Sequence, residues 1–247
     1  MLSPADLSCP ADSVLPPYFV ERGRMKRSMH PIVHAGFVEM LAQFPPPGQR
    51  VLEIGAGVDA SQTLLSVLAQ ASDRNYECVG IDLSVDHVPA GLPYDLRQMS
   101  GNDMRGFGDA SFDAVVCNAM LEHDRMFWRT LAEVRRVLKP GGLFYVGVPG
   151  YPRRRNRLQR LALRPQAGGR LGRVPGLRQL SERARLSQIA GVGTLWYHAA
   201  PRDYYRFSED AVRDVFLEEM CCLTLRYVLR PVRILAVGRR LAGPVTE

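Results

Sequence analysis

A short stretch near position 53 combines an acidic residue with closely spaced glycines. Glu53 stands two residues before Gly55, and Ala56 and Gly57 follow. Glycines at such a turn let the backbone bend sharply and come close to a ligand. A carboxylate at Glu53 would attract an ammonium or sulfonium group and repel a pyrophosphate. The stretch therefore favours a cationic ligand. Gly55, Gly57 and Ala60 also satisfy the dinucleotide pattern G-x-G-x-x-A, and a glycine turn without any ligand stays open as well.

Two more acidic residues follow apolar runs further along the chain. Asp82 ends the run before Leu83, where a carboxylate can accept hydrogen bonds from both hydroxyls of a ribose. A helix N-cap is the alternative. Asp103 could accept a hydrogen bond from an adenine amino group while the Met104 N–H donates to the ring, and a simple turn is the alternative there.

Histidine suits proton removal near neutral pH. His123 follows the fourth apolar run, and His198 lies close in sequence to three aromatic residues, Trp196, Tyr204 and Tyr205. We predict that the two histidines act as the base or contact the substrate. Helix capping for His123 and a loop role for His198 are the alternatives. The three aromatic side chains are expected to line a substrate pocket or, alternatively, to pack a neighbouring segment on the core.

Short apolar runs and helical patterns alternate between residues 50 and 150. The predicted strands are 50–54, 77–81, 95–99, 112–117 and 143–148, and the predicted helices are 31–44, 59–70 and 127–138. A helix capped by Ser208 and two tightly joined strands, 221–229 and 232–237, follow; strands joined so closely must pair antiparallel. We therefore expect a Rossmann-like, doubly wound α/β fold. Its seven-stranded sheet is mostly parallel, with the last strand antiparallel.

Composition narrows the class of protein. With 46% hydrophobic and 23% charged residues in 247, the chain is typical of a globular protein and not of a disordered, collagen-like or coiled-coil one. No apolar run reaches the length of a membrane span, and the first fourteen residues lack the order of a secretory signal. The five cysteines show no paired spacing. This favours reduced thiols, a cytoplasmic location and no metal site.

Four motifs occur in order, VLEIGAG, GIDLS, SFDAVVCNAMLEH and LAEVRRVLKPGGLFYVGVP. Over about residues 50–150 this series resembles the class I S-adenosylmethionine-dependent methyltransferases, in particular the type-11 small-molecule group. Residues 198–208 are similar to the H-x-x-P-x-D-Y-x-R-F-[ST] segment of a subset of that group. The resemblance implies S-adenosylmethionine as the cofactor and S-adenosylhomocysteine as the product.

The resemblance also implies cofactor contacts at matching positions. It places Glu53, Gly55, Ala56 and Gly57 around the methionine part, Asp82 at the ribose, Leu83 beside the adenine, Asp103 and Met104 at the adenine edge, and Asn118 beneath the cofactor. The tripeptide 121–123 matches the family's Leu-Glu-His. Two departures are visible. Residues 104–107 read Met-Arg-Gly-Phe where the family has Leu-Pro-Phe, and Asp124 replaces a valine.

The net charge of +7 comes from one segment. Between residues 151 and 192 there are eleven arginines and one acid, Glu182, so the rest of the chain is mildly acidic. We predict four parts: an N-terminal tail and lid helix (1–48), a cofactor-binding core (49–150), an arginine-rich helical insertion over the substrate (151–206), and a C-terminal helix and strand pair (207–247). An anionic acceptor, a partner surface and a solvated segment are the alternatives for the arginines.

The expected reaction is methyl transfer to an oxygen or nitrogen of a small molecule, in natural-product biosynthesis. The expected partner is that acceptor, without a membrane or a nucleic acid. A sugar, glycan or RNA acceptor, a non-catalytic nucleotide-binding protein and an NAD-dependent oxidoreductase are the alternatives. The arginine-rich segment lacks the regular aromatic spacing of RNA-stacking surfaces, which disfavours RNA.

Overall fold

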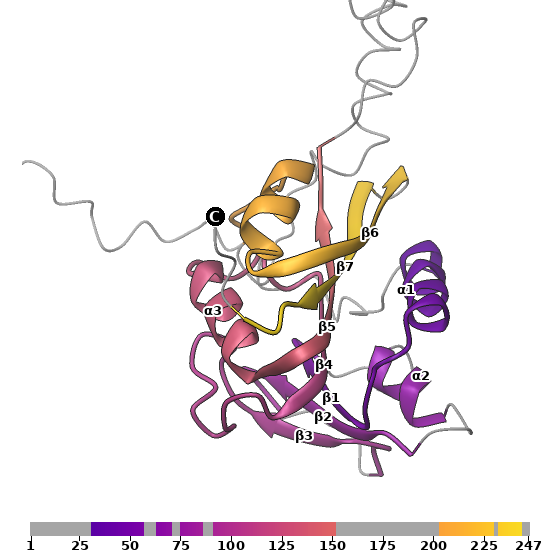
Figure 1. The fold of residues 1–247 in the computed structure, drawn as a ribbon, viewed down its shortest axis with the longest axis vertical. Helices are drawn as coiled ribbons and strands as arrows, with labels where there is room; N and C mark the ends of the chain where they lie inside the picture. Colours follow the sequence, from indigo (N-terminus) through magenta and orange to yellow (C-terminus); the bar gives the residue numbers. More distant parts are fainter. Residues whose placement is uncertain are drawn as a thin grey trace, which may run out of the picture.

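A seven-stranded sheet forms the centre of the computed structural model, which describes residues 31–56, 63–70, 75–85, 91–151, 203–229 and 232–243. The strand order is β3-β2-β1-β4-β5-β7-β6 (Figure 1). The strands are β1 (Arg50–Ile54), β2 (Glu77–Asp82), β3 (Asp95–Gln98), β4 (Phe112–Asn118), β5 (Leu138–Pro149), β6 (Met220–Leu229) and β7 (Val232–Arg240). The first five pair in parallel, whereas β7 runs antiparallel to both β5 and β6. The predicted fold class is confirmed.

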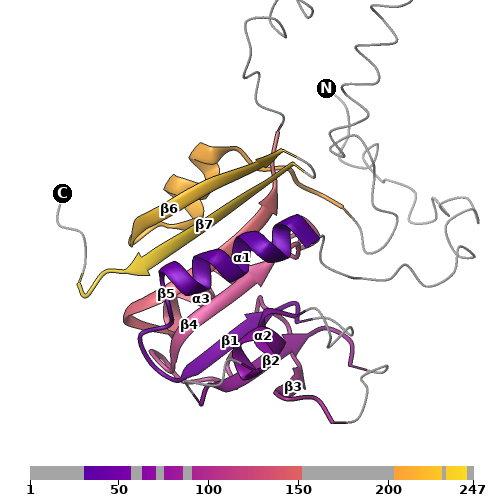
Figure 2. The same ribbon diagram turned by 90° about the vertical axis from the view of Figure 1, so that its right-hand side faces the viewer.

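Helices cover both faces of the sheet (Figures 1 and 2). On one face lie α1 (Pro31–Gln43) and α2 (Leu64–Gln70), and on the other lie α3 (Phe127–Val137) and the π-helix η4 (Ala211–Phe216). The alternation of side chains along a strand explains the two layers. In β1, Val51 packs with α1 and α2, while Leu52 and Ile54 pack with the opposite helices.

The strand order reverses between β1 and β4. From β1 the chain moves outward to β2 and β3, then returns to the other side of β1 as β4 and continues to β5. In open α/β sheets the crevice outside the carboxyl ends of the strands at such a reversal is where ligands bind. The fold therefore directs attention to the residues that follow β1 and β4.

One predicted helix start is wrong, and one predicted helix end is met within a residue. α2 begins at Leu64, five residues after the predicted start, because the Thr63 hydroxyl accepts a hydrogen bond from Ser66 N (3.2 Å) in the manner of an N-cap. The predicted cap at Asp59 lies outside the described residues. α3 ends at Val137, and the Lys-Pro-Gly-Gly run belongs to an irregular start of β5, where the register with β4 shifts.

The C-terminal helix begins as predicted. Ser208 Oγ accepts a hydrogen bond from Ala211 N (3.0 Å). The turns that follow are wider than those of an α-helix, since Leu217 N donates to the carbonyl of Val212, five residues back. Val212 and Phe216 are consequently both buried against the sheet.

Most of the predicted insertion lies outside the described residues, so its helical fragments and the domain boundaries stay predictions. Its two ends are described and adjacent. Phe207 N donates to Pro149 O (3.0 Å), beside a bridge between Gly150 and Phe207. The chain thus leaves the sheet at the end of β5 and returns to the same place. Among the described helices, none is long and apolar enough to cross a bilayer.

Candidate functional site

The turn after β1 touches the loop after β4. Gly55 has a φ of +73°, and the N–H groups of Gly55 and Ala56 both donate to Ile81 O (2.9 and 3.1 Å). A Cβ built on Gly55 would lie 2.9 Å from Cγ of Met120, which follows β4. Glycine is therefore required here by backbone conformation and by packing, before any ligand binds.

Glu53 is a buried acid at the end of β1, with 4% of its surface exposed. Its carboxylate accepts a hydrogen bond from Leu65 N (3.0 Å) in the first turn of α2. Burial raises the pKa of this carboxyl to about 8, against the lowering effect of the N–H groups of Leu65 and Leu64. A cation placed nearby would favour the ionised form, so the position suits a sulfonium or ammonium ligand.

Asp82 lies next to this turn. Ile54 pairs with Ile81 across β1 and β2, and Asp82 directly follows that last pair. Its Oδ1 accepts from Ser84 N (3.3 Å), which shapes the loop after β2. Leu83 is 71% exposed, and its carbonyl accepts from Gln98 Nε2 (3.0 Å). The structure thus brings Glu53, Asp82 and an exposed apolar side chain to one edge of the sheet, as the sequence predicts.

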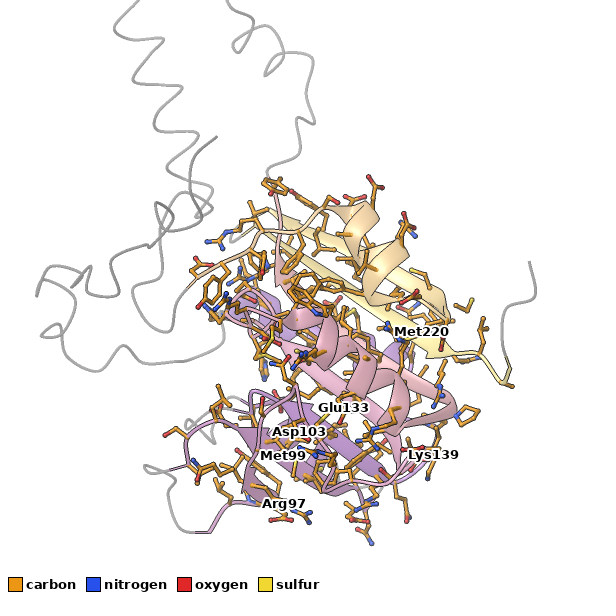
Figure 3. All side chains as sticks on the ribbon, turned by 90° about the vertical axis from the view of Figure 1, so that its left-hand side faces the viewer. Arg97, Met99, Asp103, Glu133, Lys139 and Met220 are labelled. Carbon is orange, nitrogen blue, oxygen red and sulfur yellow. The ribbon has the colours of Figure 1, made fainter. Side chains whose placement is uncertain are left out.

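The two residues of the predicted adenine edge, Asp103 and Met104, both have hydrogen-bond partners within the protein. The Asp103 carboxylate holds the guanidinium of Arg105 through two hydrogen bonds (2.7 and 2.5 Å), and these bonds lower its pKa to about 2. The Met104 N–H donates to Glu133 Oε2 (2.6 Å) on α3, and the Met104 side chain is fully buried. In Figure 3 Asp103 and Glu133 lie side by side. The Met104 N–H and the Asp103 carboxylate thus both have partners within the protein, and their roles at the adenine stay predictions.

Sequence reasoning missed the residues that hold this loop. Arg136 on α3 donates to both oxygens of Glu133 and to the Met104 carbonyl (2.8–2.9 Å). Asp124, which replaces the family's valine, accepts from Asn102 Nδ2 (2.8 Å) and from the Thr130 hydroxyl (2.7 Å). The departure from the family at Asp124 was a signal in the sequence that this residue has a role of its own. No sequence pattern indicates that Glu133 bonds to a loop some thirty residues earlier.

Asn118 ends β4 beside β5. A Cβ on Gly147 would lie 2.5 Å from Asn118 Oδ1, so the amide packs directly on that glycine. Asn118 Oδ1 is buried and has no hydrogen-bond partner among the described residues. The next residue, Ala119, has a φ of +51°, which is uncommon for a residue with a side chain. Such strained turns cluster at ligand sites, and this one lies at the reversal between β1 and β4.

His123 and two of the predicted aromatic residues come together although eighty residues separate them. The N–H groups of Tyr204 and Tyr205 donate to the carbonyl of Glu122 (2.8 and 3.3 Å). The Tyr205 hydroxyl donates to Arg125 O (2.9 Å), and its ring packs on Phe127 with centroids 5.1 Å apart. Tyr204 is 41% exposed beside it. His198, Trp196 and Gly57 lie outside the described residues, so their predicted roles stay untested.

Glu122 is a further buried acid that the sequence singled out only as part of a motif. It is 2% exposed, and burial raises the pKa of its carboxyl while Arg233 opposes that rise. Its Oε1 lies 4.0 Å from the Arg233 guanidinium. Within the described ranges, no group of three or more histidine, cysteine or acidic side chains is arranged to hold a metal ion.

Comparison with known proteins assigns the core. Residues 52–146 match the family model for a methyltransferase domain of the type-11 group. The matched part of the chain is thus similar to a methyltransferase domain. It contains the turn after β1, Asp82 and the loop after β4, which are the elements described above. The cofactor of this family is S-adenosylmethionine, as the sequence predicts.

Two curated relatives and a solved structure illustrate the likeness. The demethylmenaquinone methyltransferase of Corynebacterium glutamicum (strain R) is 36% identical over 97 residues, 39% of this chain and 40% of the relative. The ubiquinone biosynthesis O-methyltransferase of Xanthomonas axonopodis pv. citri (strain 306) is 32% identical over 108 residues, 42% of this chain and 45% of the relative. A methyltransferase structure from Methanosarcina mazei shares the fold, with a TM-score of 0.52 and 17% identity over 87% of this chain and 100% of that one.

The chain thus spans less than half the length of the curated relatives that it matches. The residues of the methyltransferase domain fit its cofactor. Glu53 offers a buried carboxylate for a cation, Asp82 lies next to the glycine turn, and Asn118 presents a buried, unpaired oxygen at the strand reversal. Glu53, Asp82 and Asn118 therefore stay the predicted contacts of the cofactor.

Proposed function

We propose that this protein transfers a methyl group from S-adenosylmethionine to an oxygen or nitrogen atom of a small molecule. The observation that carries the proposal is the buried Glu53 carboxyl group before the glycine turn of β1, in the part of the chain that is similar to a methyltransferase domain. A carboxylate there supports a sulfonium ligand. It argues against an NAD-dependent oxidoreductase, because a cation favours the ionised form of this carboxyl whereas a pyrophosphate would disfavour it.

The bound cofactor would supply a methyl group on a sulfonium, which is already a good leaving group. The protein must then align the acceptor atom with that methyl group, exclude water and remove a proton from a hydroxyl or amine. Glu53 and Asp82 would bind and orient the cofactor. His123, in the loop after β4 beside Tyr204 and Tyr205, is the candidate base, and the exposed ring of Tyr204 offers a surface for the acceptor.

We also propose that this protein works in natural-product biosynthesis, in the cytoplasm. The relatives act by name on demethylmenaquinone and in ubiquinone biosynthesis, so quinones and phenols belong in the first acceptor panel. The four described cysteines are all free, which supports a reducing compartment. Sugars and RNA form the second panel.

Calorimetry with S-adenosylmethionine and S-adenosylhomocysteine tests the cofactor, with NAD as the control ligand. We expect both sulfur compounds to bind and NAD not to bind. Acceptor panels are then screened by the S-adenosylhomocysteine that each releases. Binding of NAD with no heat from S-adenosylmethionine would overturn the proposal. Cofactor binding without turnover on any panel would instead support a non-catalytic binding protein.

A further inference from the structure

Four charged side chains meet where the loop after β4 approaches β7 and the end of the insertion. They are Glu122, Asp203, Arg206 and Arg233, and their side chains are between 3% and 17% exposed. The Arg206 guanidinium donates hydrogen bonds to both carboxylate oxygens of Asp203. The Arg233 guanidinium lies 4.0 Å from Glu122 Oε1. Two acids and two arginines balance one another, so the cluster carries its charges without a net excess.

The cluster joins segments that are far apart in the sequence. Tyr204 and Tyr205 donate their N–H groups to the Glu122 carbonyl, and Arg206 donates to the Tyr205 carbonyl (2.8 Å). Phe207 then bonds to the end of β5. All of these contacts hold residues 203–207 against the loop that carries His123.

The Glu122 carboxylate is a poor source of fold stability. Its Oε2 is buried with no hydrogen-bond partner in the described part of the chain, and the 4.0 Å separation of Oε1 from Arg233 exceeds a hydrogen bond. Replacing such a buried ion pair by apolar residues is often neutral or stabilising, whereas removing one partner is costly. A buried acid with so weak a pairing calls for another explanation.

We propose that Glu122 is a positioning residue, whose charge, through Arg233 and the Asp203–Arg206 pair, fixes Tyr204 and Tyr205 beside His123. The assignment of Tyr204 and Tyr205 to the acceptor side of the site rests on the proposed function. Their positioning by Glu122 does not depend on that function. Burial raises the pKa of the Glu122 carboxyl, and the groups that face it are Arg233, His123, Asp203, Arg206 and the Cys117 thiol.

Hydrogen exchange measures the positioning directly. In Glu122→Gln, which keeps the size and the backbone carbonyl, we expect the amides of Tyr204 and Tyr205 to exchange at least ~10-fold faster, because the charge that orients Arg233 and the Asp203–Arg206 pair is lost. Exchange within β4 should stay as in the parent. Glu39→Gln, which breaks an exposed ion pair with Arg226 (2.7 Å), is the matched control and should change neither segment. Equal exchange at Tyr204 and Tyr205 in parent and variant would overturn the proposal.

A double variant separates positioning from ordinary stabilisation. Glu122→Gln combined with Arg233→Gln removes both charges, so the melting temperature should recover toward that of the parent. Protection of Tyr204 and Tyr205 should not recover. Recovery of both would mean that Glu122 only balances charge, and would overturn the proposal.

Arg206→Lys keeps the charge but loses the two-pronged contact with Asp203, and it serves if Glu122→Gln does not fold. It should loosen Tyr204 and Tyr205 in the same way, and unchanged protection would contradict the proposal. Calorimetry with S-adenosylhomocysteine should give affinities within about twofold of the parent for both variants, and an equal loss of affinity would contradict a local role. If the parent itself fails to bind, the proposed function fails while the exchange result stands.

Discussion

The carboxyl group of Glu53 lies in a buried position where its charge is costly. Burial raises its pKa to about 8, although two N–H groups at the start of α2 favour the ionised form. The folded protein thus keeps a proton near pH 7 that the unfolded chain, with an ordinary pKa of 4.5, has released. A cationic cofactor would displace this proton. The buried carboxyl thus lowers the free energy of unfolding at the place where a sulfonium would bind.

Stability should accordingly fall as pH rises. The contribution of Glu53 is fully present below pH 4.5 and is lost as pH rises toward 8, by up to about 5 kcal/mol. Glu53→Gln should remove this pH dependence, be more stable than the parent at pH 8, and bind S-adenosylmethionine more weakly. Thermal melts from pH 5 to 9 and calorimetry measure both effects. Glu77→Gln, at an exposed ion pair with Arg50, is the control. Parallel melting curves for parent and Glu53→Gln would contradict the prediction.

Asp82 and Asp103 should differ in their effect on cofactor affinity. Asp103 already holds Arg105, whereas Asp82 lies next to the glycine turn. Asp82→Asn should weaken S-adenosylmethionine binding more than ~10-fold, because hydrogen bonds to a charged group are worth roughly 1.5–3 kcal/mol. Asp103→Asn should change the affinity less than about threefold. Calorimetry on both variants measures the two affinities, and the reverse order would support Asp103 as the adenine contact.

At the scale of elements, the site is the meeting of the turn after β1 with the loop after β4. Gly55 has a positive φ, and Met120 packs directly over it. The turn after β1 and the loop after β4 therefore stabilise each other. The loop after β3 depends on α3 in the same way, through Glu133 and Arg136. The loops that follow β1, β3 and β4 are thus held in place by side chains from neighbouring elements and not by their own sequences.

Gly55→Ala should cost more stability than Gly91→Ala. Both glycines have positive φ, of +73° and +82°. A Cβ at Gly91 meets nothing within 4 Å, so only the conformational cost of about 1 kcal/mol applies. At Gly55 the Cβ also meets Met120, which adds roughly 1–3 kcal/mol of overpacking. Urea denaturation compares the two. The combination Gly55→Ala with Met120→Ala should relieve the contact, and no relief would argue against the packing described here.

Local patterns predicted the elements well and their cross-connections poorly. Alternating apolar runs located all seven strands, and parallel pairing places the acids that end β1 and β2 together. The start of α2 was wrong because the capping pattern at Asp59 competes with Thr63, which the structure uses. The partner of the Met104 N–H could not be predicted, since a hydrogen bond to Glu133 leaves no periodic signal in the sequence. The Leu-Glu-His motif singled out Glu122, but nothing in the sequence indicated that Arg233 would lie beside it.

At the scale of the whole molecule, one segment carries the excess charge and leaves the sheet at a single point. The Pro149 carbonyl and the Phe207 N–H are 3.0 Å apart, so the core closes without the residues between them. The mildly acidic methyltransferase core and the arginine-rich stretch can therefore be separated by experiment.

Replacing residues 153–201 with a short Gly-Ser linker should leave a folded core. The linker need only join two adjacent ends, and loop closure depends weakly on length. Net charge should change from +7 to −3, so retention on cation exchangers and on heparin should be lost. Cofactor affinity should stay within about threefold of the parent, since Glu53 and Asp82 are untouched. Circular dichroism, chromatography and calorimetry report these outcomes, and loss of cofactor binding would mean that the stretch contributes to the cofactor site.

The position of β7 has a consequence for biosynthesis. β7 is the last of the described strands along the chain, yet it lies between β5 and β6 and pairs with both. While the chain emerges from the ribosome, the edge of β5 that faces β7 has no partner until residues 232–240 have been made. An open, apolar strand edge is a template for association with other chains. A stop codon before Val232 would thus leave the cofactor-binding half of the sheet translated in full, with β5 free to recruit neighbours into aggregates.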